Sequence, residues 1–439
     1  MLMIGNKVAV GISGGVDSAV SALLLKRAGF DVVGVHLYCW PPKSEVERDG
    51  VTREEWIKKN GCRADEDRAS ALKTALEIGI PFKELDFSEE YNSRVIKYFY
   101  DEYETGRTPN PDVLCNSEIK FGLFLEWALE NGFDSIATGH YAKNKNSSLF
   151  AFDHNPSLAT VGSNSPAEFA RLNSQLEFPT SLEPSNSSFR SVAQRTDGLA
   201  NNLIFLQIPK DKHKDQTYFL WKLTEKELKH TIFPLGDLLK SEVREIAKEA
   251  GLTVADKKDS QGICFVGNVE VREFLKRRLE EKPGEVVDKA GNVLGKHKGV
   301  AFYTIGERGG WTLDPRTQKL QTSRTQDGDI TKIYYVVDKI ANTNRLVVGD
   351  KSEVMSKKIM VGNISLIDHK EHETLDGHDL YVRIRHGGEL FKVKELKESR
   401  TQDKELTFEL EKEVFGVASG QSAVFYSEAG LCLGGGVLV

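Results

Sequence analysis

The chain has 439 residues, 39% hydrophobic and 28% charged, and a formal net charge of −6 from 59 Lys and Arg against 65 Asp and Glu. This length predicts two or three domains, and the composition excludes disordered, collagen-like and coiled-coil chains. The sequence contains no run of 18 apolar residues, so no membrane span is predicted. The first residues lack the layout of a signal peptide. Five cysteines are too few for a disulfide framework and indicate a reducing, cytoplasmic compartment.

The first 140 residues alternate strand and helix signals. Apolar runs predict strands, and longer runs closed by glycine predict helices. In chain order, the predicted elements are 7–12, 16–28, 31–37, 64–78, 82–87, 89–104, 117–131 and 135–139. Strand and helix in this rhythm predict parallel strands joined by right-handed crossovers, and therefore an open α/β sheet.

The rest of the chain changes character twice. Residues 146–203 contain 11 Ser, 7 Asn and 4 Pro, which predicts a long surface insertion, and strand signals resume at 203–208. Residues 216–281 are mainly helical in pattern, with helices at 241–250 and 269–281, and short alternating runs after residue 284 predict a small antiparallel barrel. We therefore expect three domains: a catalytic domain with the insertion at 1–230, a central domain at 231–298 and a C-terminal β-barrel at 299–439.

A glycine-rich segment, Gly-Ile-Ser-Gly-Gly-Val-Asp-Ser at 11–18, joins the first predicted strand to the first helix. Adjacent glycines let the backbone approach phosphate oxygens, and the helix N-terminus offers unpaired N–H groups. Asp17 is placed to hold Mg²⁺ or to cap the helix. The segment is neither a Walker loop nor a dinucleotide fingerprint, and a turn without a ligand is the alternative. The pattern favours a phosphate site.

Two cysteines lie in segments that suit a reactive thiol. Cys115 follows two prolines and precedes the helix expected at 117, whose dipole would favour the thiolate, although a small buried hydrophobic residue fits the position equally. Cys264 follows a charged run in which Lys257 and Lys258 would favour a thiolate, with a strand-core cysteine as the alternative. The remaining cysteines have no Cys-x-x-Cys spacing and predict no zinc site: Cys39, Cys62 and Cys432.

Residues 13–18 resemble the PP-loop of ATP pyrophosphatases, enzymes that split ATP into AMP and pyrophosphate while adenylating a substrate. Further segments resemble one family within that class, the tRNA-specific 2-thiouridylases, in that family's order: 106–122, 137–142, 214–220, 233–237, 256–265, 303–306 and 419–426. The resemblance covers nearly the whole chain except the insertion. It implies an adenine nucleotide alpha hydrolase-like parallel-sheet domain, a small central domain and a C-terminal antiparallel β-barrel.

The resemblance also implies a chemistry. Enzymes of this family adenylate the C2 oxygen of the wobble uridine (position 34) of tRNA, and a cysteine persulfide then delivers sulfur to C2. At the matching positions, Cys264 is expected to carry the persulfide and Cys115 to release its sulfur through a transient disulfide. Asp112 is expected to act as general acid and base, with a turn residue after proline as the alternative. Asp112 stands where some thiolation relatives have a further cysteine, so no iron–sulfur cluster is expected.

The same resemblance implies two sets of binding residues. The expected ATP contacts are Gly11, Ile12, Ser13, Gly14, Gly15, Val16, Asp17, Ser18, Leu37 and Gly139. The expected tRNA contacts are Asn110, Pro111, Asp112, His140, Lys214, Asp215, Gln216, Arg385, His386 and Gln421. Arg385 keeps only part of the family pattern, and His140 is also compatible with a structural histidine at a strand end.

The expected partners are tRNAs for Lys, Glu and Gln, together with an upstream sulfur-carrier protein or cysteine desulfurase, and the chain itself is expected to be a monomer. Two other interpretations remain. A PP-loop enzyme with a non-tRNA substrate, such as an amide-forming synthetase, would need neither Cys115 nor Cys264. An RNA-binding module with a relict loop is the second, and the intact Ser13, Asp17 and Ser18 argue against it.

Overall fold

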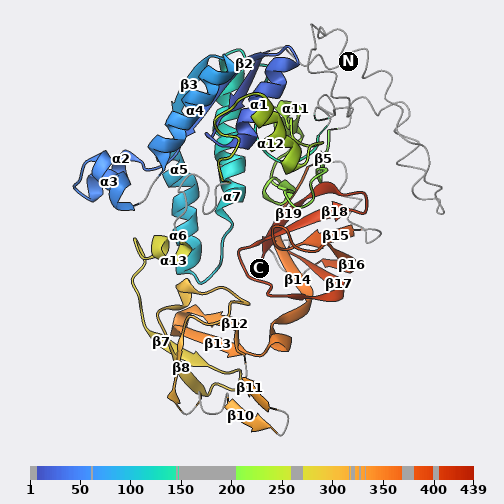
Figure 1. Cartoon of the computed structure of the whole chain (residues 1–439). Helices are drawn as coiled ribbons and strands as arrows, with labels where there is room; N and C mark the ends of the chain where they lie inside the picture. The colour runs from blue at the N-terminus through green and yellow to red at the C-terminus, as the bar shows by residue number, and fades with distance from the viewer. Residues whose placement is uncertain are drawn as a thin grey trace, which may run out of the picture.

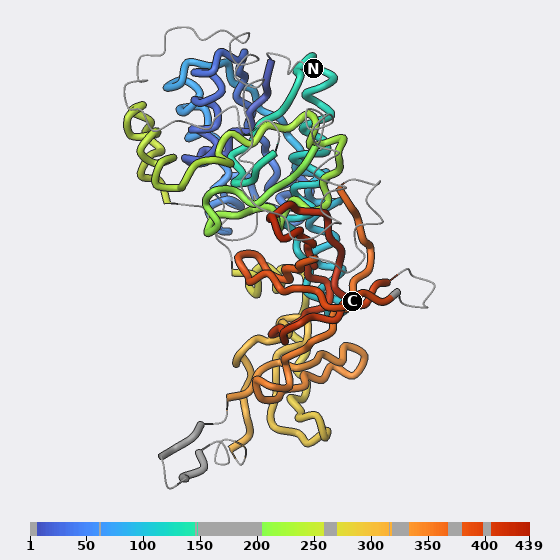
Figure 2. Tube along the Cα trace, turned by 90° about the vertical axis from the view of Figure 1, so that its right-hand side faces the viewer, coloured from blue at the N-terminus to red at the C-terminus, as the bar shows by residue number. Residues whose placement is uncertain are grey.

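The computed structural model describes the chain over ranges that leave out most of the predicted insertion and the segment containing Cys264. They are residues 7–60, 63–144, 147, 204–258, 270–315, 317, 322–325, 328–331, 333–367, 380–398 and 405–439. An α/β unit forms one end of the molecule, a small β unit forms the other end, and a β-barrel lies beside both (Figure 1). The perpendicular view shows the same elongated arrangement (Figure 2). No helix among these ranges is long and apolar enough to cross a membrane.

The α/β unit is built on a five-stranded parallel sheet, as predicted. Its order is β3 (Phe82–Asp86), β2 (Asp31–Tyr38), β1 (Lys7–Gly11), β4 (Ser135–Ala137) and β6 (Thr231–Ile232). In β1, Val8 and Val10 belong to one buried cluster and Ala9 to another, because successive side chains of a strand point to opposite faces. Both faces are therefore buried, which is why these strands are almost continuously apolar.

Helices cover the two faces of this sheet. The face that buries Val8 packs against α1 (Val16–Arg27), α4 (Ala64–Ile78) and α12 (Lys240–Glu249). The opposite face packs against two long helical runs. The first comprises α5 (Ser88–Tyr91), the π-helix η1 (Asn92–Ile96) and α6 (Lys97–Glu104), and the second α7 (Pro111–Leu114), the π-helix η2 (Cys115–Leu123) and α8 (Phe124–Glu130).

The second helical run begins at Pro111, six residues before the predicted start, so the expectation of a loop around Cys115 was wrong. Proline suits the first position of a helix because its missing N–H would have no partner there and its φ is already helical. Asn110 precedes it in extended conformation, with φ −113° and ψ 91°. The helix dipole therefore acts first on Asp112, whereas Cys115 lies about one turn inside the helix.

Shorter elements complete the α/β unit. Strand signals at 203–208 correspond to β5 (Leu206–Gln207), and the helix expected at 269–281 is described only as α13 (Val271–Leu275). α2 and α3 project from the side of the unit in Figure 1. The remaining elements are α2 (Lys43–Arg48), α3 (Arg53–Asn60), the 3₁₀-helix η5 (Thr217–Phe219) and α11 (Glu225–Lys229).

The central unit is a mixed sheet in the order β12-β13-β7-β8-β9, with a separate β10–β11 hairpin. Its core is made by valines and leucines of the paired strands, including Val286, Val336 and Leu346. Its elements are β7 (Gly284–Val287), β8 (Val293–His297), η6 (Val300–Phe302), β9 (Thr312–Leu313), β10 (Thr322–Thr325), β11 (Gly328–Thr331), β12 (Tyr335–Ile340), η7 (Ala341–Thr343) and β13 (Arg345–Gly349).

The C-terminal unit is the predicted antiparallel barrel. Its strands run β14-β17-β16-β15-β18-β19, and pairing of β14 with β19 closes the ring around a core that includes Phe408 and Phe425. β5 of the α/β unit pairs with β19 of the barrel and so ties the two units together. Its elements are η8 (Lys351–Val354), β14 (Met355–Leu366), β15 (Leu380–Arg383), β16 (Phe391–Glu398), β17 (Leu406–Phe415), β18 (Ser422–Ser427) and β19 (Leu431–Leu438).

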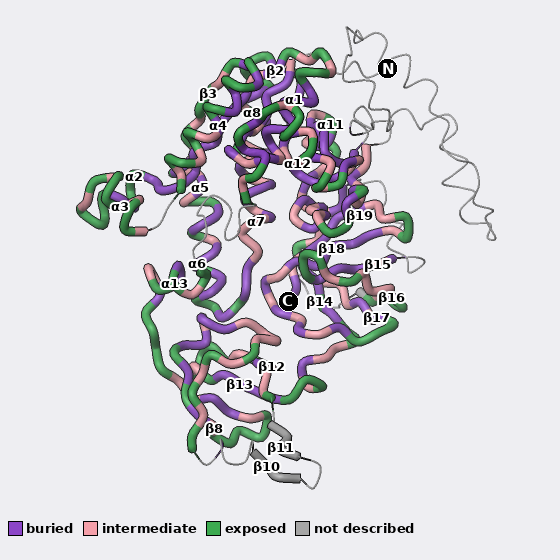
Figure 3. Tube along the Cα trace, in the orientation of Figure 1, coloured by how far each residue is buried: buried purple, intermediate pink, exposed green. Residues whose placement is uncertain are grey.

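The domain boundaries differ from those expected at residues 230 and 298. Residues 231–232 belong to the parallel sheet as β6, and α12 packs on α1, so the α/β unit extends to at least residue 258. The strands β7 and β8, at 284–297, pair with each other, and β7 also pairs with β13, so both belong to the same unit as residues 335–349. Buried residues form separate cores in the sheet region and in the barrel (Figure 3).

Candidate active site

The predicted phosphate loop lies at the carboxyl end of β1, between the two neighbouring strands β2 and β4. Open α/β sheets bind ligands at such a switch point in strand order. Gly14 has φ +77°, which favours glycine, and Gly15 leaves the N-terminus of α1 without a side-chain cap. Inside the loop, Ser18 Oγ accepts a hydrogen bond from Ser13 N at 3.1 Å. The loop thus has unpaired helix N–H groups and hydroxyls at one point, which is the arrangement of an anion site.

Gly139 lies directly against this loop. A Cβ at this position would lie 2.6 Å from the backbone N of Ser18 and 2.8 Å from the carbonyl carbon of Asp17. Only glycine lets the end of β4 approach the first turn of α1 this closely. The structure therefore brings Gly139 together with the loop, as predicted for two parts of one nucleotide site.

Replacing Gly139 with alanine should lower the rate of the ATP cleavage expected at this loop at least tenfold, because the new methyl group displaces the first turn of α1. Release of pyrophosphate in the presence of tRNA measures this rate. A thermal melt should show that the variant is still folded, since the clash is local. A variant that cleaves ATP at the rate of the parent protein would contradict the close-contact argument.

Lys240, at the start of α12, reaches the loop from the other end of the domain. Its Nζ donates to both carboxylate oxygens of Asp17, at 2.6 and 2.8 Å. Tyr141 donates a third hydrogen bond to Asp17 through its hydroxyl at 2.9 Å. The sequence analysis named neither Lys240 nor Tyr141 as a site residue. Lys240 could have been found from its position, because it lies three residues after the segment 233–237 that resembles the family.

A second lysine contacts the same loop. Lys257 Nζ donates to the carbonyl of Gly14 at 2.8 Å and to Asp67 at 2.9 Å. Arg244 holds this lysine in place because its guanidinium donates to the carbonyl of Lys257 at 3.1 Å. The sequence predicted that Lys257 would favour a thiolate at Cys264, whereas the structure directs its ammonium group to the phosphate loop.

The helix that begins at Pro111 carries two of the predicted catalytic residues, Asp112 and Cys115. Asp112 is partly exposed and Cys115 is fully buried, at 0% exposure. Residues three apart on a helix share a face, so Asp112 lies at the more exposed end of that face and Cys115 at its buried end. Phe121 of the same run packs on His140 with ring centroids 5.6 Å apart, next to Gly139. The helix and the phosphate loop therefore meet through the 139–140 segment.

Cys264 lies outside the described residues, so its predicted pairing with Cys115 stays a prediction. Cys39 and Cys432 are both buried, and burial raises the pKa of Cys432 to about 12, which keeps it as a neutral thiol. The described ranges contain no group of three or more His, Cys, Asp and Glu side chains that could hold a metal ion.

The segment leading to the catalytic helix is fixed by the two β units. Thr108 N donates to the carbonyl of Ser419 at 2.8 Å, and Gln421 Nε2 donates to the carbonyls of Thr108 and Pro109 at 2.9 and 3.1 Å. From the central unit, Lys339 Nζ donates to Thr108 Oγ1 at 3.4 Å, and burial lowers the pKa of Lys339 to about 8. Gln421, predicted to contact tRNA, therefore holds the segment before Asn110.

The predicted tRNA stretch at 214–216 joins the α/β unit to the barrel. Asp215 is 2% exposed, and its carboxylate accepts from Thr217 Oγ1 at 2.7 Å and from Arg383 of β15 at 2.5 Å. Gln216 Oε1 accepts from Tyr141 N at 2.8 Å, which links this stretch to the residue that binds Asp17. Because the Asp215 carboxylate is buried and engaged within the protein, we revise its predicted role from tRNA contact to support of the site.

The other predicted contact residues fall into two groups. Arg385 and His386 are exposed, and His386 stacks on Phe219 at 4.5 Å, so both can meet a large ligand. His140 is buried and bonds to Thr138 Oγ1 at 2.8 Å, and burial holds its pKa well below the usual value, which fits the structural alternative. Leu37 is buried in β2 at 7% exposure, so its predicted contact with adenine stays a prediction. Lys214 and Asn110 are partly exposed.

Family models match three consecutive parts of the chain. The tRNA methyl transferase HUP domain matches residues 6–158 and 191–268, the tRNA methyl transferase PRC-barrel domain matches 272–350, and the aminomethyltransferase beta-barrel domain matches 356–438. These ranges agree with the three units of the structure. The fold and the phosphate loop therefore define a three-domain protein of the HUP, PRC-barrel and β-barrel arrangement.

Full-length relatives narrow this class. The tRNA-specific 2-thiouridylase MnmA of Lactococcus lactis is 35% identical over 437 residues, which covers 99% of this chain and 94% of the relative. That of Bacillus licheniformis is 36% identical over 440 residues, covering 99% and 95%. The chain belongs to the tRNA-specific 2-thiouridylase family, which confirms the family expected from the sequence.

Proposed function

We propose that this protein is an ATP-dependent sulfurtransferase that converts the wobble uridine of tRNA to 2-thiouridine, with release of AMP and pyrophosphate. The observation that carries the proposal is the meeting of two sites through one short segment. Gly139 touches the phosphate loop and His140 touches the helix that carries Asp112 and Cys115. In a chain of this family, a phosphate loop connected in this way to a buried thiol favours a two-step reaction. A base is first activated by adenylation and then receives sulfur.

The phosphate loop would bind the triphosphate of ATP. The N–H groups at the start of α1 would meet the phosphate oxygens, and Lys240 and Lys257 would move from Asp17 and Asp67 to the bound phosphates. Mg²⁺ usually takes one or two carboxylates together with phosphate oxygens, and the carboxylate of Asp17, part-exposed at the loop, fits that need. The ion would neutralise charge on the leaving pyrophosphate.

Asp112 would hold or remove the N3 proton of the flipped uracil while its C2 oxygen attacks the α-phosphorus and pyrophosphate leaves. Asn110 is placed to help orient the base, since its side chain hydrogen-bonds to the buried Tyr218. Tyr218 is itself fixed by donating to the carbonyls of Ile384 and Ser422 at 3.1 and 3.0 Å. The barrel thereby sets the position of the base-binding segment.

The transfer of sulfur to C2 requires two cysteines, one to carry the sulfur and one to release it. The terminal sulfur of a Cys264 persulfide would bond to C2. Cys115, as thiolate, would then attack the inner sulfur, forming a Cys115–Cys264 disulfide while the S–S electron pair passes to the transferred sulfur and AMP leaves C2. A cellular thiol must reduce the disulfide for the next cycle. An upstream sulfur-carrier protein or cysteine desulfurase would recharge Cys264, and tRNAs for Lys, Glu and Gln would be the substrates of a cytoplasmic, monomeric enzyme.

The decisive experiment incubates the full chain with ATP, Mg²⁺, a cysteine desulfurase supplied with cysteine as the persulfide source, and tRNA that lacks the modification, then digests the tRNA and measures 2-thiouridine by mass spectrometry. We expect product from the parent protein and none from Cys115→Ala, which should still release pyrophosphate while AMP stays bound to C2. Cys432→Ala is the matched control, because this buried thiol has no role in the proposal. Thiolation that persists in Cys115→Ala would exclude the mechanism and favour an amide-forming or other PP-loop enzyme.

A further inference from the structure

The helical run that carries Cys115 is not a regular α-helix at that residue. Between α7 and α8 the chain forms nine residues of π-helix, η2 (Cys115–Leu123), in which each N–H bonds to the carbonyl five residues earlier. π-Helix is rare and mostly limited to single turns at functional sites, because its backbone geometry is less favourable than that of an α-helix. A stretch of this length that begins at the predicted nucleophile needs a specific cause.

The burial pattern shows what the wide turns achieve. The buried face of this run follows spacings of four, five and four residues: Cys115, Ile119, Phe124 and Ala128. In a regular α-helix the face of Cys115 would continue through Glu126, which is exposed. The π-helical stretch therefore keeps Cys115 on the buried face together with Phe124 of α8.

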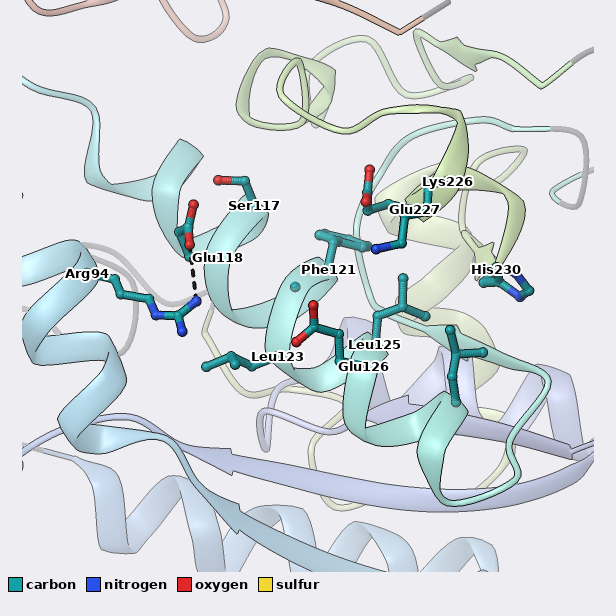
Figure 4. Close-up of a pocket in the computed structure, with 12 residues that line it drawn as sticks. Arg94, Ser117, Glu118, Phe121, Leu123, Leu125, Glu126, Lys226, Glu227 and His230 are labelled. Atoms are coloured by element: carbon teal, nitrogen blue, oxygen red, sulfur yellow. Dashed lines mark hydrogen bonds and ion pairs between the residues drawn. The ribbon is translucent and has the colours of Figure 1, made fainter.

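Gly122 is the residue that permits this geometry. A Cβ at Gly122 would lie 2.8 Å from the carbonyl oxygen of Ser117, and among the described residues no neighbouring element comes within 4 Å of it. Gly122 instead lines a surface pocket of about 300 Å³, so the space on its outer side is open. Figure 4 shows this pocket between the helix that carries Ser117 and Phe121 and the segment that carries Lys226 and Glu227. The carbonyl of Ser117, five residues earlier in the same helix, therefore requires glycine at position 122.

Asn116 holds the first wide turn from outside the helix. It is 3% exposed, and its Nδ2 donates to the carbonyl of Phe219 at 3.1 Å. Within the described part of the chain its Oδ1 is buried without a hydrogen-bond partner. A buried acceptor left unpaired is unfavourable, so the position next to Cys115 is kept at an energetic cost, as is common where a site needs a defined geometry.

We propose that η2 is the element that positions Cys115 for sulfur transfer, with Gly122 and Asn116 as its positioning residues. The inference rests on the proposed role of Cys115 as the attacking thiol. An α-helix turns roughly 20° more per residue than a π-helix, so a return of η2 to α-helix would rotate Cys115 away from its present direction relative to α8. The phosphate loop, Asn110 and Asp112 all lie outside η2, so the adenylation step does not depend on its geometry.

The test compares Gly122→Ala with the parent protein and with the control Ser117→Ala, which changes the same turn without adding a Cβ. We expect Gly122→Ala to release pyrophosphate within about threefold of the parent rate in a single turnover, while 2-thiouridine formed per pyrophosphate falls at least tenfold. The rate at which iodoacetamide alkylates Cys115, read on its peptide by mass spectrometry, should also change at least threefold. Ser117→Ala should match the parent protein in both measurements.

A Gly122→Ala protein with unchanged 2-thiouridine per pyrophosphate and unchanged alkylation would overturn the inference, particularly if it also melts at a higher temperature, as alanine for glycine in an ordinary helix should. If that variant does not fold, Asn116→Ala takes its place with the same two measurements and the same criterion. A parent protein that makes no 2-thiouridine would contradict the proposed function alone, because the alkylation rate still decides whether Gly122 and Asn116 position the thiol.

Discussion

Replacement of Lys240 by methionine should lower the rate of tRNA-dependent pyrophosphate release by about 100-fold, the usual effect of removing one donor that stabilises developing charge in a water-poor site. Methionine keeps the length and apolar stem of the side chain and removes only the ammonium group. In the structure this group binds both oxygens of Asp17 in the phosphate loop, at 2.6 and 2.8 Å. Without the Lys240 ammonium group, its positive charge would no longer balance the Asp17 carboxylate in the free protein or the phosphates in the bound state.

Lys248→Met is the matched control for this prediction. Lys248 lies on the same helix, α12, but its side chain is 59% exposed and pairs with the exposed Asp256 at 3.2 Å. Such a surface pair contributes little, so this variant should retain the parent rate. If Lys240→Met cleaves ATP as fast as Lys248→Met, then Lys240 only neutralises Asp17 in the resting protein and does not act on the nucleotide.

Replacement of Asp215 by alanine should lower the free energy of unfolding by about 3–5 kcal/mol, because it leaves a buried guanidinium without its carboxylate partner. Asp215 is 2% exposed and Arg383 is 8% exposed, and the two are joined at 2.5 Å across the contact between the α/β unit and the barrel. The change also removes the acceptor for the N–H and the hydroxyl of Thr217. Denaturation by urea, followed by circular dichroism, measures the loss.

Two further variants separate this effect from a general loss of charge. Asp215→Ala combined with Arg383→Met should recover part of the stability, since no buried charge is then left unpaired. Glu285→Ala breaks the exposed pair with Arg345, whose side chains are 47% and 45% exposed, and should cost less than about 1 kcal/mol. A loss in Asp215→Ala no greater than in Glu285→Ala would show that the pair does not hold the two units together.

Local signals accounted for the fold class and for the phosphate loop. Alternating apolar runs and helices closed by glycine predicted the parallel sheet, because burial of both sheet faces leaves a pattern within each strand. The Ser-Gly-Gly-Val-Asp-Ser segment predicted the anion site, since glycine conformation and a helix start are properties of neighbouring residues. The domain boundaries were displaced because β6 and β7 are too short to reveal which sheet they join.

The site itself contained features that neighbouring residues could not reveal. Lys240 and Lys257 reach the loop from more than 200 residues away in the chain, through hydrogen bonds to Asp17 and Gly14. The π-helix at Cys115 was missed because its pattern of buried spacings, four, five and four, differs from an α-helix by a single residue. Asp215 looked like an exposed contact, and only its pairing with Arg383 of the barrel shows it to be buried.

The composition and the order of motifs along the chain determined by themselves the class of fold, the family and the residues expected to react. The acidic balance of −6 did not oppose a tRNA substrate, because recognition is expected to rest on local contacts and one flipped base, not on total charge. Only the tertiary structure decided which cations meet the phosphate loop, how the barrel fixes the segment before Asn110 and which way Cys115 faces. These are contacts between residues far apart in the chain, and they exist only once the packed core has set the positions of the backbone segments that carry them.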